Sequence, residues 1–142
     1  MADPFDLERF VAAQDAVMAN VRAELAAGAK RSHWMWFVFP QAAGLGFSTM
    51  AERYAIRSRA EARAYLAHPL LGPRLRECTG LVLDVKDRDA HAIFGSPDDL
   101  KFRSAMTLFA AEGETLCRQA LDAFFAGKQD VRTLSITRGW DG

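Results

Sequence analysis

Signals that begin and end helices recur along almost the whole of this 142-residue chain, and they constrain its fold more than any other feature. Asp3-Pro4 places a capping carboxylate before a proline, which the first turn of a helix tolerates. Ser58 and Glu61 have the spacing of a capping box. The sequence from Ser96 to Asp99 combines a cap, a proline and two acids that favour the positive end of a helix dipole. The pattern predicts a chain made mainly of helices.

Apolar residues recur at helical spacing between these signals, as in the run from Leu7 through Phe10 to Leu25. At about 1.5 Å per residue, this first helix would be roughly 35 Å long. The expected helices cover residues 50–57, 59–67, 73–85 and 89–94, with three more that end at Gly28, Gly113 and Gly127. We expect an all-α fold, a compact orthogonal bundle of about six to eight helices. Residues 1–142 are expected to form a single helical domain, in which 128–142 either pack as an extra turn or form a loosely packed tail.

The aromatic segment 32–41 leaves one local question open. Trp34 and Trp36 would share a face if the segment were a strand, and would lie about 200° apart if it were a helix. Both faces of the segment are apolar, so periodicity does not distinguish a buried strand from a buried helix. Pro40 ends the element in either case.

The composition narrows the class of protein. Eighteen basic residues balance eighteen acidic ones, which argues against a general nucleic-acid binder. No apolar run approaches the ~20 residues of a membrane span, and no secretory signal is evident at the start of the chain. Cys78 and Cys117 lack C-x-x-C spacing, so we expect reduced thiols and a cytoplasmic location. The sequence leaves the oligomeric state open.

The aromatic segment and the cations before it suggest a ligand pocket. Lys30 and Arg31 could contact phosphate or carboxylate groups, and Trp34 could stack on a flat ring. The alternative is that both cations favour a helix C-terminus and that both indoles lie in the core. We expect one of Trp34 and Trp36 to line a pocket and the other to be buried.

Two further groups of residues could complete this pocket. Gln41 precedes the glycine-containing loop 44–46, where backbone can approach a ligand closely. Lys101, Ser104 and Thr107 form a narrow polar stripe on one predicted helix, at positions i, i+3 and i+6. Such a stripe is either a solvated face or a row of polar groups set among apolar ones in a cleft.

Candidate catalytic residues are few. His33 is the first choice for acid–base chemistry near neutral pH, and Asp89 is the candidate carboxylate. The three histidines are 35 and 23 residues apart, without metal-ligand spacing, so we expect no metal. No dinucleotide or phosphate-loop motif occurs, and we expect no bound cofactor.

The segment 30–41 and several later motifs resemble a bacterial family named domain-of-unknown-function 1810, sometimes labelled calpastatin. The later motifs are Gly44-Leu45-Gly46, Glu61-Ala62-Arg63-Ala64-Tyr65-Leu66, Leu71-Gly72-Pro73-Arg74-Leu75, Ile93-Phe94-Gly95 and Ser104-Ala105-Met106-Thr107-Leu108-Phe109. The resemblance implies a compact, mostly helical domain. Calpastatins are disordered polar inhibitors, unlike this chain, half of which is hydrophobic.

A fainter resemblance is to the NADAR family of helical proteins linked to ADP-ribose. Ser32-His33-Trp34 stands where that family has an acid, a histidine and an aromatic residue, and the segment 89–95 is similar to its second motif. Ser32 replaces the family's acid.

We therefore expect a pocket for a nucleotide or an ADP-ribose-like molecule, and the NADAR resemblance implies N-glycosidic bond hydrolysis as the reaction. The alternative is a non-catalytic interaction or structural module with an aromatic core. An accessible cleft beside the aromatic segment would favour the first function, and a solid core there would favour the second.

Overall fold

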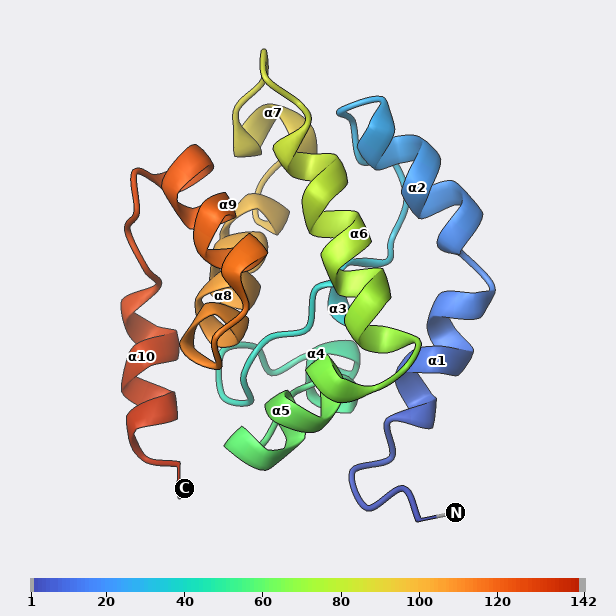
Figure 1. Ribbon diagram of the computed structural model, residues 1–142, viewed down its shortest axis with the longest axis vertical. Helices are drawn as coiled ribbons and strands as arrows, with labels where there is room; N and C mark the ends of the chain where they lie inside the picture. Colours follow the sequence, from blue (N-terminus) through green and yellow to red (C-terminus); the bar gives the residue numbers. More distant parts are fainter. Residues whose placement is uncertain (1, 141–142) are drawn as a thin grey trace.

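The computed structural model describes residues 2–140 and folds them into ten helices around one apolar core (Figure 1). In chain order the helices are α1 (Glu8–Asp15), α2 (Met18–Ala26), α3 (Met35–Val38), α4 (Thr49–Arg53), α5 (Arg59–Ala67), α6 (Leu71–Leu83), α7 (Ala90–Phe94), α8 (Asp98–Ala111), α9 (Thr115–Phe125) and α10 (Val131–Arg138). No strand occurs in residues 2–140, where Ala42 and Ile56 form an isolated parallel bridge. The predicted all-α class is confirmed, but the predicted number of helices is too small.

Helix α6 lies across the middle of the molecule and packs against α2, α5 and α9 (Figure 1). Helix α8 packs against α9, α7 and α10, so that α10 covers the outer side of the α8–α9 pair. The single turn of α3 contacts α1, α6 and α8. This central position explains why the aromatic segment is apolar on every side.

Capping side chains hold several helix starts, as the sequence indicates. The Ser58 hydroxyl accepts the Glu61 N–H at 3.0 Å, which confirms that N-terminal cap. Helix α4 is capped by Ser48, which accepts the Ala51 N–H at 3.1 Å, and it begins at Thr49, one residue before the predicted start at 50. Asp89 caps α7 by accepting the Ala92 N–H at 2.8 Å.

The long first helix that we expected is two helices. Helix α1 ends at Asp15 and α2 begins at Met18. The buried positions Gln14, Met18 and Val21 keep helical spacing across the break, so apolar periodicity gives no sign of it. Gly28 ends α2 in the left-handed region, at φ +70°, as the sequence predicts.

The end of the chain also differs from its prediction. Residues 128–140 are not a loosely packed tail, because they include α10, which packs on α8. Thr133 and Thr137 of α10 are buried, and Asp130 accepts the Thr133 N–H at 3.1 Å to cap the helix. With the separate α1 and α2 and the short α3, this extra helix accounts for the larger count.

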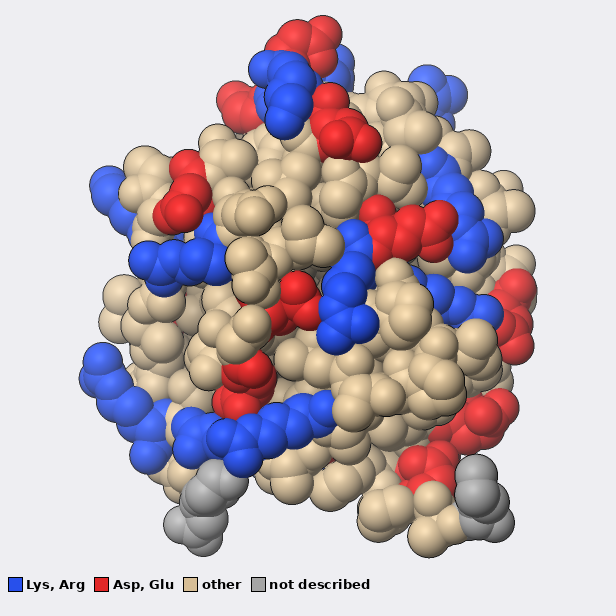
Figure 2. Space-filling view, in the orientation of Figure 1, with Lys and Arg blue, Asp and Glu red and all other residues tan. Residues whose placement is uncertain are grey.

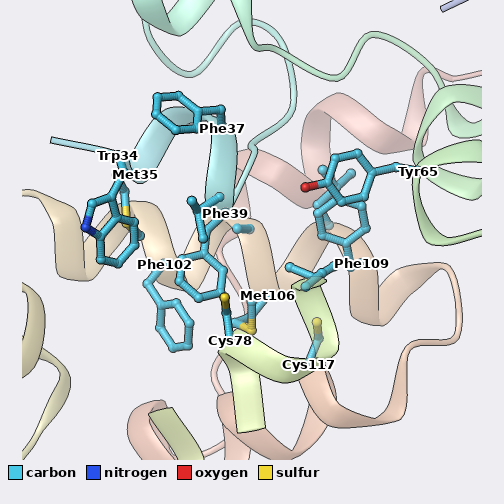
Figure 3. Close-up of a cluster of buried hydrophobic side chains, with 14 of the residues drawn as sticks. Trp34, Met35, Phe37, Phe39, Tyr65, Cys78, Phe102, Met106, Phe109 and Cys117 are labelled. Atoms are coloured by element: carbon cyan, nitrogen blue, oxygen red, sulfur yellow. The ribbon is translucent and has the colours of Figure 1, made fainter. Parts of the chain in front are cut away.

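Aromatic rings fill the core around α3 (Figure 3). Phe39 meets Phe102 edge to face at 5.0 Å between ring centroids, and Phe102 stacks on Phe94 at 4.6 Å. Tyr65 contacts Phe109 at 5.2 Å in a second group. Such ring pairs add stability beyond the apolar area that they bury.

A single carboxylate holds the start of the aromatic segment. Glu24 on α2 accepts hydrogen bonds from the backbone N–H groups of Arg31 and Ser32, from the Ser32 hydroxyl and from the Trp34 indole, at 2.6 to 3.0 Å. Desolvation raises the pKa of Glu24, but these hydrogen bonds together outweigh it and lower the pKa from its ordinary 4.5 to about 2. The ionised carboxylate therefore stabilises the fold.

Glu24→Gln should lower the free energy of unfolding at pH 7 by about 1.5–3 kcal/mol, the range for hydrogen bonds to a charged group. The folded-state pKa lies below the unfolded one, so this contribution is complete above pH 4.5 and is lost as the pH falls toward about 2. Urea unfolding at several pH values should show the difference between wild type and variant shrinking in acid.

The matched control is Glu77→Gln, which removes an exposed ion pair with Arg22 at 3.0 Å. Exposed pairs contribute about 0–1 kcal/mol, so this variant should unfold nearly like the wild type. A wild-type-to-Glu24→Gln difference that stays constant down to about pH 2.5 would contradict the assigned role of the Glu24 carboxylate.

Candidate functional site

A cleft of about 600 Å³ lies where three distant parts of the chain meet. One side is the segment from Gln41 to Ala51, a second is the first two turns of α8, and the third is the start of α10. Trp36 on α3 also lines it. Its size falls within the range of ordinary small-molecule sites.

One of the two tryptophans lies in the core and the other lines the cleft. The one at the cleft is Trp36, whereas the stacking role was assigned to Trp34. Trp34 is 0% exposed and lies in the core (Figure 3), so it does not line the cleft. Trp36 is partly exposed and lines the cleft. The segment is a helical turn, and residues two positions apart on a helix point in divergent directions.

Lys101 brings a positive charge to the cleft beside this indole. Its Nζ lies 5.1 Å from the centroid of a Trp36 ring, a cation–π distance. The same Nζ is 3.4 Å from Oδ1 of Asp98, whose other oxygen is 2.7 Å from Nζ of Lys30. One carboxylate thus faces two ammonium groups, so Asp98, Lys30 and Lys101 together carry a net positive charge that an anionic ligand could meet at Lys101.

Lys30 itself has a structural position. Its side chain is buried, and besides Asp98 it contacts the carbonyl of Ser32 at 2.6 Å and the ring of Trp34 at 5.1 Å. It therefore connects the chain after α2 to the start of α8 and does not line the cleft. Its predicted contact with a ligand does not fit this placement.

Polar residues of α8 both line the cleft and hold the chain at the start of α10. Ser104 lines the cleft, and its hydroxyl lies 3.1 Å from Oδ2 of Asp130. Thr107 is fully buried and accepts the Asp130 N–H at 2.9 Å. Arg103 donates to the carbonyls of Lys128 and Gln129 at 2.8 and 2.9 Å. The stripe thus holds the start of α10 against α8, and of its three predicted residues only Lys101 and Ser104 reach the cleft.

Gln41 lines the cleft, whereas the remaining candidates lie elsewhere. Arg31 and His33 are exposed and do not line the cleft, although the backbone of Arg31 is held by Glu24. Asp89 caps α7 and lies in a different surface hollow. The expected pair of His33 and Asp89 is therefore not assembled in the cleft.

Several lining residues were missed from the sequence, among them Phe47, Arg103, Asp130 and Arg132. A cap signal was available at Asp130, which precedes Thr133 by three residues. Arg132 was not considered as a site residue, because residues 128–142 were not expected to pack beside the pocket. No ion pair or hydrogen bond of the Arg132 side chain occurs with any other residue between 2 and 140.

Outside the cleft, eight of the fifteen lysines and arginines between residues 2 and 140 pair with a carboxylate. Figure 2 shows basic and acidic side chains next to one another over much of one face. Arg59 and Arg63 both pair with Glu112, and Arg76 pairs with Glu114. In the cleft, Lys101 pairs with Asp98, whereas Arg103 and Arg132 form no ion pair with another residue between 2 and 140.

The two cysteines and the possible metal-binding side chains were considered as further candidate sites. Burial raises the pKa of both Cys78 and Cys117 to about 12, which makes them poor nucleophiles. Among residues 2–140, no cluster of three His, Cys, Asp or Glu side chains is placed to bind a metal ion. Within the same range, no helix has the length and apolar character needed to cross a membrane.

Thr107→Val should lower the free energy of unfolding by about 1–3 kcal/mol, because the Asp130 N–H then loses its acceptor in a partly buried place. Urea unfolding measures this effect. The control is Ser135→Ala on the exposed side of α10, which should stay within about 0.5 kcal/mol of wild type. Equal effects of the two substitutions would contradict the role of Thr107.

Comparison with known proteins gives a family and a closely similar fold. The chain is similar to a solved structure, the crystal structure of the conserved hypothetical protein Rv1873 from Mycobacterium tuberculosis, with 54% sequence identity and a TM-score of 0.94. That match covers 96% of this chain and 99% of the other. No curated protein matches the chain. A family model described as "Protein of unknown function (DUF1810)" matches residues 4–137, and the chain therefore belongs to the DUF1810 family.

Proposed function

We propose that the cleft binds a small molecule that carries a flat ring and an anionic group, such as a nucleotide or an ADP-ribose-like compound. The observation that carries the proposal is the position of Lys101, which lies against Trp36 inside a cleft of about 600 Å³. A ring beside the indole and an anion beside the ammonium group would both find complementary partners there.

The other lining groups support the same ligand chemistry. Arg103 and Arg132 add positive charge from the α8 and α10 sides, where phosphate or carboxylate oxygens would be held. Gln41 and Ser48 supply neutral polar groups on the opposite side. A cleft with apolar surface and a few convergent polar groups is the usual form of a small-molecule site.

The proposal is for binding, and it includes no hydrolytic step. N-glycosidic bond hydrolysis would require a general acid–base group at the ligand, and neither His33 nor Asp89 lines the cleft. The lining carboxylate Asp130 is engaged with Ser104 and Thr133 at the start of α10. The cleft is thus better suited to hold a ligand than to cleave it.

Lys101→Ala and Arg132→Gln should each weaken binding of AMP or ADP-ribose by roughly 10-fold or more, because each removes a charge-assisted contact worth about 1.5–3 kcal/mol. Isothermal titration calorimetry measures the affinities. Wild type at a ligand concentration of about 100 times Kd should gain about 2.7 kcal/mol of stability.

Arg31→Gln is the matched control, since Arg31 is an exposed arginine outside the cleft. Its variant should bind AMP and ADP-ribose like the wild type. Failure of the wild type to bind either compound, or equal losses in the Arg31 and Arg132 variants, would overturn the proposal.

A non-catalytic interaction module is the second candidate function. The observation that favours it is the strong exposure of two large apolar side chains at the mouth of the cleft, Phe47 at 77% and Leu100 at 56%. Exposed apolar surface of this kind can mark a protein contact. A pull-down that depends on Phe47 and Leu100, with no binding of nucleotides, would favour the module over the small-molecule site.

A further inference from the structure

The cleft holds a second aromatic side chain whose exposure needs an explanation. Trp36 and Phe47 both line the cleft, but Trp36 is partly buried whereas Phe47 is 77% exposed. A phenylalanine on a soluble surface is usually covered by something, and here it stands at the mouth of a hollow that already contains one aromatic ring.

Hydrogen bonds hold the backbone on both sides of Phe47 but not at the residues between them. The Ala43 N–H donates to the Ile56 carbonyl at 2.8 Å, and Ser48 accepts the Ala51 N–H at 3.1 Å. Between them, no backbone N–H of residues 44–48 donates to an acceptor within the described chain. Phe47 can therefore turn inward without breaking a hydrogen bond of the protein.

The residues beside Phe47 favour the same movement. Gly46, which precedes it, lies so close to Ala51 that a Cβ at position 46 would be 2.9 Å from the Ala51 Cβ, so the loop is anchored there and Phe47 is the side chain that is free to turn. Leu45 packs against the core and keeps the segment in place. Leu100, on α8, is 56% exposed and also lines the cleft, so it offers apolar surface to an inward-facing ring.

Trp36 alone offers incomplete contact to a flat ligand. The Lys101 ammonium group already lies over one of its rings, at 5.1 Å from the centroid. A flat ring in the cleft has two faces, and burial of both requires a second apolar surface opposite the indole. Among the lining residues, Phe47 is the other aromatic side chain.

We propose that Phe47 is a specificity-determining residue that closes over the ring of the ligand, so that the cleft selects a nucleobase-bearing anion over a sugar phosphate without a base. This inference rests on the proposed function of the cleft, and it names the part of the ligand that the protein distinguishes. Stacking of bases on aromatic side chains tolerates any base, so the site distinguishes the presence of a base more strongly than its identity.

The test compares AMP with ribose 5-phosphate, which has the same sugar phosphate but no base. Wild type should bind AMP more tightly by roughly 5- to 100-fold, the range that one base–aromatic stacking contact gives. Phe47→Ala should remove most of this preference by weakening AMP alone, and Phe47→Tyr should retain it. Leu70→Ala is the control, because Leu70 is also an exposed apolar residue but lies outside the cleft.

Movement of the ring is measured separately with 4-fluorophenylalanine placed at position 47. Its ¹⁹F signal should shift between H₂O and D₂O in the free protein and lose that solvent sensitivity with AMP bound, because the ring becomes covered. A ring that stays solvent-sensitive with AMP bound would overturn the closure.

The outcomes separate the two proposals. If AMP and ribose 5-phosphate bind equally, or if Phe47→Ala weakens both to the same degree, the cleft binds anions but Phe47 does not recognise a base. If neither compound, nor ADP-ribose, binds the wild type, the proposed function itself fails and the inference fails with it.

Discussion

The hydrogen bonds that Glu24 accepts determine which way the aromatic segment faces. The carboxylate holds the indole of Trp34 and the backbone just before it, so Trp34 is directed into the core. The next residues form the helical turn α3, on which Trp36 points away from Trp34. The surface that lines the cleft is thus a consequence of how the interior is anchored, and a charge on α2 decides the position of an indole on α3.

Local signals in the sequence predicted the helices well, because caps and glycines act within one turn. Ser58, Asp98 and Gly28 behave as their residue types indicate. The break between α1 and α2 was missed because the buried face continues through it with unchanged spacing. Helix α10 was missed because a short run of mixed residues gives a weak periodic signal, and its stability comes from packing on α8.

The candidate site was predicted only in part, and the reason is geometrical. Of the candidate residues, Gln41, Lys101 and Ser104 line one cleft. Which of two neighbouring indoles turns outward depends on the helical or extended state of the segment, and periodicity did not distinguish these. Arg132 comes from a part of the chain about 30 residues away from Lys101, and only the docking of α10 brings the two together.

The connection between α8 and the chain before α10 has a consequence for how this protein acquires its cleft. Three side chains of α8 bind residues 128–130. Arg103 donates to two backbone carbonyls, Ser104 contacts the Asp130 carboxylate and Thr107 accepts the Asp130 N–H. Asp130 and Arg132 line one side of the cleft only while these contacts keep the start of α10 against α8. If α10 separated from α8, the cleft would lose that side and become an open surface.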